Sequence, residues 1–165
     1  MAAEIPVTRN ETPLERDDRN FVELLQELRV IQTGVQILFA FLLTLAFTPR
    51  FPDLDSYQRG AYVTTLMLAA LAAIVFTAPA VLHRSLFRRG AKRRVVEVSS
   101  VLARAGLGVL ALSLTGAVLL VVDVVMGRAA GLCAAGGILL ACAALWLALP
   151  WEVGRRHRER VLPTD

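Results

Sequence analysis

The sequence predicts an all-α, polytopic membrane protein with four transmembrane helices. Of its 165 residues, 56% are hydrophobic and only 19% are charged, so the chain is more apolar than an ordinary globular domain. Four apolar windows are each long enough to span a bilayer, and none has the polar face that a helix of a soluble bundle needs. These windows cover residues 30–47, 61–82, 105–122 and 129–149.

The distribution of basic residues predicts the orientation of the spans. Fourteen arginines and lysines lie in the N-terminal segment, in the connection between the second and third spans and in the C-terminal tail. Only Arg50, Arg59 and Arg128 lie in the other two connections. Basic residues near span ends are retained in the cytoplasm, so both termini are expected there, with the basic segments close to anionic lipid headgroups. Because this topology explains the net positive charge, no nucleic-acid partner is expected.

The first helix is predicted to run from Asn20 to Phe47 and to extend into the cytoplasm. Its first turns repeat apolar residues with the spacing of an amphipathic helix. A helix of this length, at about 1.5 Å per residue, exceeds the ~30 Å hydrocarbon core. Residues 1–19 are expected to form a mobile tail, residues 20–151 the membrane domain and residues 152–165 a basic cytoplasmic tail.

The two short connections carry signals of their own. Asp55 and Gln58 have the spacing of a capping box, which predicts a helix start at Asp55. Asp123 and Arg128 flank a tight turn that contains Gly127, so the third and fourth spans are expected to be antiparallel neighbours.

Stripes of small residues predict where helices approach one another. In the second span, alanines and threonines recur every four residues and include Ala69 and Ala73; in the fourth span, Cys133 and Gly137 belong to a similar stripe. Lipid provides no hydrophobic drive for helix association, so small residues that permit close packing are favoured at contacts. The contacts could lie within one protomer or between protomers.

The first helix also has a polar edge that enters the membrane. At 100° per residue, Gln32, Thr33 and Gln36 lie on one side of the helix. A glutamine facing lipid is unfavourable, so this edge is expected to face another helix or a wet cavity. Hydrogen bonding between helices is the simpler interpretation, and the lining of a pathway is the alternative.

Charges near the inner boundary favour structural pairing over catalysis. Glu27 and Arg104 are expected at similar depth and could form an ion pair between the first and third helices. Cys133 and Cys142, the only cysteines, lie about 900° and 13.5 Å apart on one helix and cannot form a disulfide. No catalytic residue, metal site or cofactor is predicted, and an enzyme is not expected.

The segment QELRVIQTGVQILFAFLLTLAFTPRF, followed by a short loop and QRGAY, resembles an uncharacterised family of small four-span bacterial membrane proteins. The resemblance covers nearly all of the chain after the N-terminal tail and implies a shared architecture in the bacterial inner membrane. Some members of that family carry an automatic sodium:proton antiporter label. The resemblance supplies no motif whose residues have known roles.

The acidic residues of this sequence argue against a single protomer acting as an antiporter. Such exchange normally needs a carboxylate within the membrane, but Asp53, Asp55 and Glu97, the acidic residues between Arg29 and Val122, belong to loops or boundaries. The sequence therefore favours a channel-like or transport-related homo-oligomer. A non-catalytic scaffold or accessory subunit of a larger membrane complex is the alternative.

Overall fold

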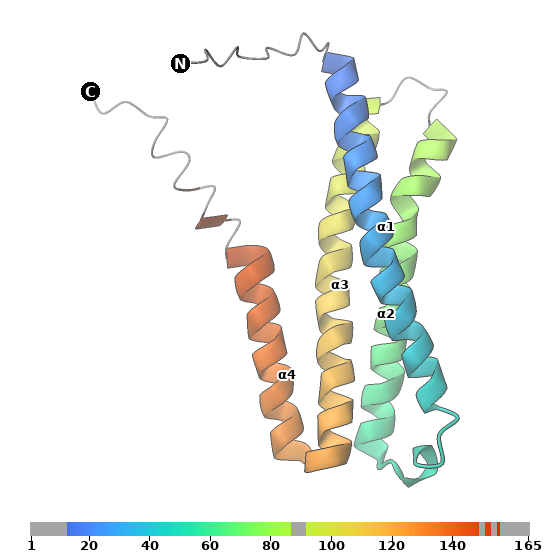
Figure 1. Cartoon of the computed structure of the whole chain (residues 1–165), viewed down its shortest axis with the longest axis vertical. Helices are drawn as coiled ribbons and strands as arrows, with labels where there is room; N and C mark the ends of the chain where they lie inside the picture. Colours follow the sequence, from blue (N-terminus) through green and yellow to red (C-terminus); the bar gives the residue numbers. More distant parts are fainter. Residues whose placement is uncertain (1–12, 87–91, 149–150, 153–154, 156–165) are drawn as a thin grey trace, which may run out of the picture.

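The fold consists of four long helices arranged as one bundle (Figure 1). The computed structural model describes residues 13–86, 92–148, 151, 152 and 155. In this part of the chain, the α-helices are α1 (Pro13–Leu45), α2 (Ser56–Leu86), α3 (Lys92–Met126) and α4 (Arg128–Ala143). A short 3-10 helix, η1 (Phe51–Asp53), precedes α2, and a π-helical turn, η2 (Ala144–Ala148), continues α4.

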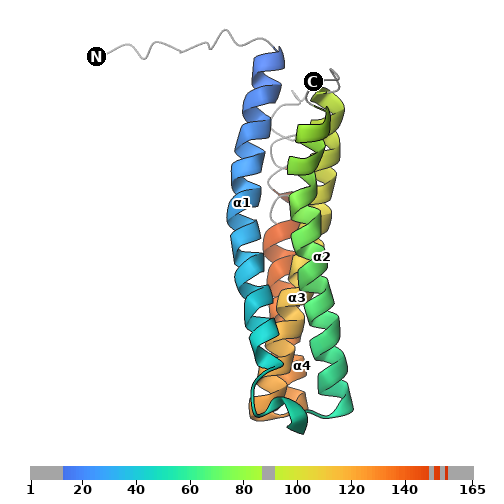
Figure 2. The same cartoon turned by 90° about the vertical axis from the view of Figure 1, so that its right-hand side faces the viewer.

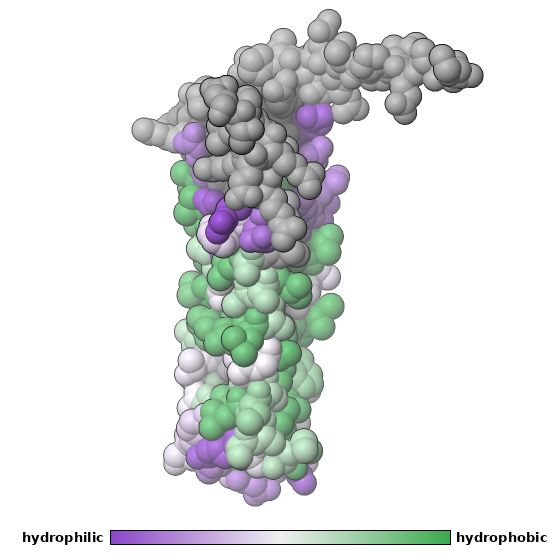
Figure 3. Space-filling view, turned by 90° about the vertical axis from the view of Figure 1, so that its left-hand side faces the viewer, coloured by the Kyte–Doolittle hydropathy of each residue, from purple (hydrophilic) through white to green (hydrophobic). Residues whose placement is uncertain are grey.

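All four helices are long and apolar enough to span a membrane, which confirms the predicted fold class. The candidate spans are Val22–Leu45, Ser56–Leu82, Val96–Met126 and Arg128–Ala148. A band of apolar side chains on the α4 side of the molecule separates polar side chains at the two ends (Figure 3). The start of α1 and the end of α4 lie toward the same end of the bundle (Figure 1). Which side of the membrane this end faces stays a prediction.

Helix α1 begins earlier than the sequence predicted. It starts at Pro13, so residues 13–19 belong to α1. The prediction that the N-terminal tail extends to residue 19 is therefore wrong. Proline is favoured in the first turn, where its missing amide hydrogen has no helical partner to lose. Residues 1–12, which complete the predicted N-terminal tail, and residues 156–165 of the C-terminal tail lie outside the described part.

The closest helix contact joins α2 to α3. A methyl group added at Gly106 would lie 2.8 Å from Cε1 of Phe76, and one added at Gly116 would overlap the side chain of Thr65. The hydroxyl of Ser113 donates a hydrogen bond of 3.2 Å to the carbonyl oxygen of Thr65. Glycine and serine therefore bring the two backbones together, as small residues do in membrane helix packing.

Helices α1 and α4 pack on this pair in different ways, since α1 contacts both α2 and α3 whereas α4 packs against α3. The phenol of Tyr62 on α2 donates a hydrogen bond of 3.0 Å to the carbonyl oxygen of Leu42 on α1. Helix α4 packs against α3 through Gly131, where an added Cβ would lie 2.9 Å from Cβ of Asp123. The single residue Gly127, with φ of +89°, links α3 to α4 and confirms the predicted tight turn. A glycine is required there because other residues rarely adopt this conformation.

Candidate functional site

The polar edge of α1 is divided between two environments. The half-buried side chain of Gln32 donates a hydrogen bond of 3.0 Å from Nε2 to the hydroxyl of Thr77 on α2. The same hydroxyl donates a 2.7 Å bond to the carbonyl oxygen of Ala73. Gln32 thus connects α1 to α2, as the simpler of the two sequence interpretations proposed.

The remaining polar residues of this edge point away from the bundle. Thr33 and Thr44 are exposed, and their hydroxyls donate to the carbonyl oxygens of Arg29 and Ala40 within α1. Gln36 is also exposed, and its side chain forms no hydrogen bond with any residue that the structure describes. The nine residues from Gln36 to Leu45 span about 14 Å, which places the amide near the middle of a ~30 Å hydrocarbon core.

The interior between α1, α2 and α3 is largely apolar, although the hydroxyls of Thr65, Ser99 and Ser113 on α2 and α3 are also buried. Two clusters fill it, and their buried members are hydrophobic side chains. They comprise Leu28, Val35, Leu42, Tyr62, Ala69, Ala72, Phe76, Ala117 and Leu120. Within the described residues, the polar edge of α1 therefore lines no path through one protomer.

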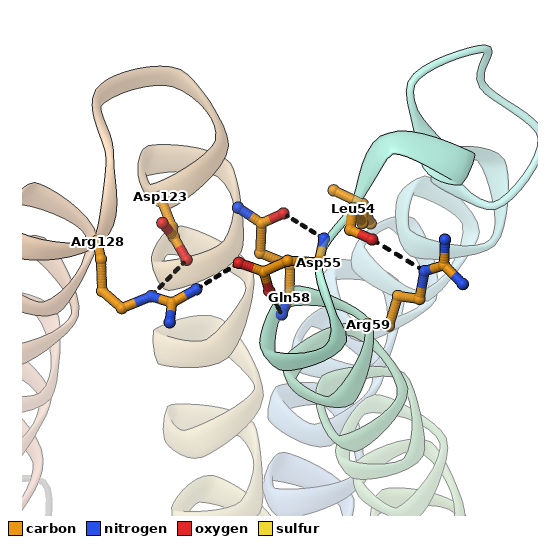
Figure 4. Close-up of polar contacts among 6 residues, drawn as sticks. All are labelled: Leu54, Asp55, Gln58, Arg59, Asp123 and Arg128. Atoms are coloured by element: carbon orange, nitrogen blue, oxygen red, sulfur yellow. Dashed lines mark hydrogen bonds and ion pairs between the residues drawn. The ribbon is translucent and has the colours of Figure 1, made fainter.

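A charge cluster ties the connection before α2 to the turn between α3 and α4 (Figure 4). Nη2 of Arg128 lies 2.6 Å from Oδ2 of Asp55, and Nε of Arg128 lies 3.7 Å from Oδ2 of Asp123. The guanidinium also lies over the ring of Tyr57, 4.1 Å from its centroid. One arginine at the start of α4 thus links the loop before α2 to the end of α3.

The capping box predicted at Asp55 is formed. The backbone amide of Asp55 donates to Oε1 of Gln58 at 3.0 Å, and the backbone amide of Gln58 donates to Oδ1 of Asp55 at 2.8 Å. The Gln58 amide holds the pKa of the Asp55 carboxyl below its ordinary value, and Arg128 lowers this pKa further. Asp55 is therefore fixed as a carboxylate that faces Arg128.

Asp123 is the acidic residue that the sequence argument missed. Its side chain is 4% exposed, and it lies within the candidate span Val96–Met126, one residue beyond the predicted third span, which ended at residue 122. Its burial follows from the close approach of Gly131, which was not predicted. The signal available in the sequence was the placement of Asp123, Arg128 and Asp55 at the same end of the spans.

The structure does not form the predicted ion pair between Glu27 and Arg104. Both residues are exposed, and no ion pair joins them in the described part of the chain. Arg104 instead lines a groove between α3 and α4, whereas α1 packs mainly on α2. Similar depth along the bundle was not sufficient, because Arg104 faces a groove to which α1 contributes no residue.

The two stripes of small residues differ in burial: the α2 stripe packs against the core, whereas the α4 stripe is exposed. On α2, Ala69 is fully buried, and the partly buried Ala73 packs against the core, so this stripe makes the expected contacts. On α4, Cys133 and Gly137 are exposed, and an added Cβ at Gly137 would meet nothing within 4 Å. These two residues therefore make no close helix contact within the protomer, and the predicted alternative of a contact between protomers stays a prediction. Helix α4 buries Gly131, Ala135 and Cys142 instead.

The cysteines and the other potential ligands suggest no chemical centre. Cys133 is exposed, Cys142 is buried, and both are free. Among the described residues, no group of three histidine, cysteine or acidic side chains could hold a metal ion. The polar groups considered below are the α1 edge and the charge cluster around Arg128.

Four spanning helices, a largely apolar interior and polar side chains at both ends define a small polytopic membrane protein. The chain belongs to a family of unknown function, DUF6328, whose family model matches residues 10–150. The match covers all four helices and agrees with the resemblance seen in the sequence. No curated protein and no solved structure matches the chain.

Proposed function

We propose that the protein is a non-catalytic scaffold or accessory subunit that assembles as a homo-oligomer. The contact between copies is the outward face of α1, defined by Arg29, Thr33, Gln36 and Thr44. The observation that carries the proposal is the exposed amide of Gln36 near the middle of the bilayer. In Figure 2, no other helix lies on the side of α1 that faces away from α2 and α3.

An unpaired amide at this depth is unfavourable, because the hydrocarbon core offers no hydrogen-bond partner. A second copy of α1 supplies one, since an amide both donates and accepts and two glutamines can satisfy each other across a symmetric contact. The neighbouring residues on this face, Thr33, Ala40 and Thr44, are small and exposed. They permit the close approach that interhelical hydrogen bonds need.

The scaffold function is favoured over conduction because the outward face offers few free polar groups. The hydroxyls of Thr33 and Thr44 already donate to backbone carbonyls of α1. Only the Gln36 amide has free donors near the middle of the span, and one amide per copy is a sparse replacement for the hydration shell of an ion.

A channel-like or transport-related homo-oligomer is the second candidate. One observation favours it: Arg29, Thr33, Gln36 and Thr44 are all exposed on the same side of α1, from its inner part almost to its end at Leu45. A ring of such helices would place these residues around a common axis. The pathway would then lie between copies, since the interior of one protomer is largely apolar.

The assembly is tested by comparing two glutamines of the same helix. Gln36→Leu is expected to shift the oligomer toward monomer in lipid nanodiscs, measured by native mass spectrometry, because an interhelical bond contributes about 1–2 kcal/mol in model peptides. Gln32→Leu removes the bond to Thr77 within the protomer. It should lower the thermal stability of the protomer and leave the oligomer size unchanged. A wild-type protein that is monomeric in nanodiscs would contradict the proposal.

Flux measurements in proteoliposomes separate the two functions. The scaffold function predicts no flux of protons, sodium, potassium or chloride above that of empty liposomes, under both voltage polarities. Flux that Gln36→Leu abolishes without changing oligomer size would favour the channel-like function. Flux that survives this substitution would place a pathway away from the outward face of α1.

A further inference from the structure

A groove between α3 and α4 is a feature that the assembly through α1 leaves unexplained. It has a volume of about 260 Å³ and runs along α3 from Arg104 to Leu112. On α4 and η2 its wall includes Leu139, Cys142 and Trp146. The two helices are joined at Gly127 and diverge toward the opposite end of α4 (Figure 1). The groove is therefore a wedge that opens toward that end.

The charge of the groove is concentrated at its mouth. Arg104 is exposed and forms no ion pair with Glu27. It precedes Asp123 by nineteen residues of α3, which span about 28 Å. Since Asp123 lies near one end of the ~30 Å hydrocarbon core, Arg104 lies at the opposite boundary, at the level of lipid headgroups.

The widened turn of α4 adds an aromatic group to the same region. The chain changes from α-helix to the π-helical turn η2 at Ala144, and Trp146 within this turn lines the groove. Such turns are rare and often occur at functional sites. A tryptophan at a membrane boundary is favoured because its ring is apolar and its N–H is polar.

The geometry points to a binding site for an anionic phospholipid, with one acyl chain in the groove and the phosphate at Arg104. The eight residues from Arg104 to Leu112 extend about 12 Å along α3, close to the ~15 Å depth of one leaflet. The guanidinium can donate two parallel hydrogen bonds to phosphate oxygens. The remaining wall is almost entirely apolar and matches a hydrocarbon chain.

The shape of the site favours a lipid over a second copy of the chain. The mouth with Arg104 opens at the membrane boundary, where headgroups are concentrated, and the apolar wall continues from it into the hydrocarbon core. A free phosphate ion would use the arginine but not the apolar wall. The inference holds whether or not copies assemble through α1, because the groove lies between α3 and α4.

Trp146 allows the site to be tested by fluorescence. The protein contains two tryptophans, so Trp151→Phe leaves Trp146 as the only one. In vesicles with brominated acyl chains, a chain in the groove quenches Trp146. Brominated phosphatidylglycerol should occupy the site about fivefold more tightly than brominated phosphatidylcholine, the ratio that corresponds to ~1 kcal/mol per basic residue.

Matched substitutions separate the headgroup contact from the chain contact. Arg104→Gln should abolish the preference for phosphatidylglycerol, Arg104→Lys should retain most of it, and Arg84→Gln, an exposed arginine outside the groove, should leave it unchanged. Gly108→Leu should reduce quenching by both lipids, since an added side chain there enters open space in the groove. Gly136→Leu, also in open space but outside the groove, is its control.

Four results would overturn the inference. The first is equal quenching by both lipids in the protein with native Arg104, and the second is a preference that survives Arg104→Gln. The third is a preference abolished by inorganic phosphate while Gly108→Leu leaves the quenching unchanged, which would indicate a phosphate site without an acyl chain. If neither lipid quenches Trp146 and Gly108→Leu changes the oligomer size, a second copy occupies the groove.

Discussion

Helices α2 and α4 both flank α3, yet they use similar sequence patterns in opposite ways. Each has small residues at fourfold spacing, with Ala69 and Ala73 on α2 and Cys133 and Gly137 on α4. The α2 stripe lies against neighbouring helices, whereas the α4 stripe faces outward. Helix α2 packs against both α1 and α3, while α4 packs against α3. A helix with two neighbours buries more of its surface, so a stripe on it has a greater chance of making a contact.

The rotation of α4 about its axis explains the outcome there. Its buried residues, Gly131 and Ala135, are each displaced by two positions from Cys133 and Gly137. Two residues correspond to about 200° around a helix, so the expected stripe lies on nearly the opposite face. The turn at Gly127 and the contacts of Arg128 orient the first turn of α4, and this orientation carries through the helix. Spacing identifies a face, but only these contacts decide where it points.

The largest expected effect comes from adding the same bulk to each stripe. Ala69→Leu should lower the free energy of unfolding by about 1–3 kcal/mol, because a fully buried alanine leaves no room for a larger side chain. Gly137→Leu should change it by less than about 0.5 kcal/mol, since the added side chain enters open space. The measurement is thermal unfolding and denaturant titration in detergent.

The same pair of variants also tests whether the small-residue stripe of α4 is free of contacts. If Gly137→Leu is as costly as Ala69→Leu, the outward stripe of α4 makes a contact with another copy or partner. Its effect would then depend on protein concentration in lipid, whereas the effect of Ala69→Leu would not.

The next effect concerns the arginine that orients α4. Arg128→Gln should lower the free energy of unfolding by about 1–2 kcal/mol, because the carboxylate of Asp123, only 4% exposed, loses its cation. Adding Asp123→Asn to this variant should restore part of the loss, because the buried charge is removed as well. A double variant that is no more stable than Arg128→Gln would show that the buried charge is not the cause.

The fold was predictable from the sequence because it depends on local signals. Apolar windows define the spans, the Asp55 and Gln58 pair starts α2, and Gly127 closes the turn between α3 and α4. The contacts of the site were less predictable, because they depend on how each helix is rotated about its axis. Gln32 forms a hydrogen bond with Thr77 and Gln36 forms none with a described residue, although both lie on the same edge of α1.

The missed contacts share this physical cause. Glu27 and Arg104 are both exposed, but Arg104 faces a groove that contains no residue of α1, and no pattern within either helix reports this. Asp123 is buried because Gly131 of the next helix approaches it closely. Both results depend on how two helices pack against each other, and no pattern within a single helix reveals this packing.

The smallest expected effect is a pH dependence of the link between α4 and the loop before α2. The Gln58 amide and Arg128 lower the pKa of Asp55 from its ordinary value of 3.8, so the ionised carboxyl stabilises the folded state. This contribution is fully present above pH 3.8 and is lost as the pH falls through the lower pKa of the folded state. The melting temperature of the wild type should therefore fall more steeply below this pH than that of Asp55→Asn.

A matched carboxylate in the same connection provides the control. Asp53→Asn changes an exposed residue whose side chain makes none of the contacts of the Arg128 cluster, so it should keep the slope of the wild type. If Asp53→Asn flattens the slope as much as Asp55→Asn does, the effect reflects the total charge of the connection. A slope specific to Asp55 would instead identify its contacts with Gln58 and Arg128 as the source, and so tie the start of α4 to the entry of α2.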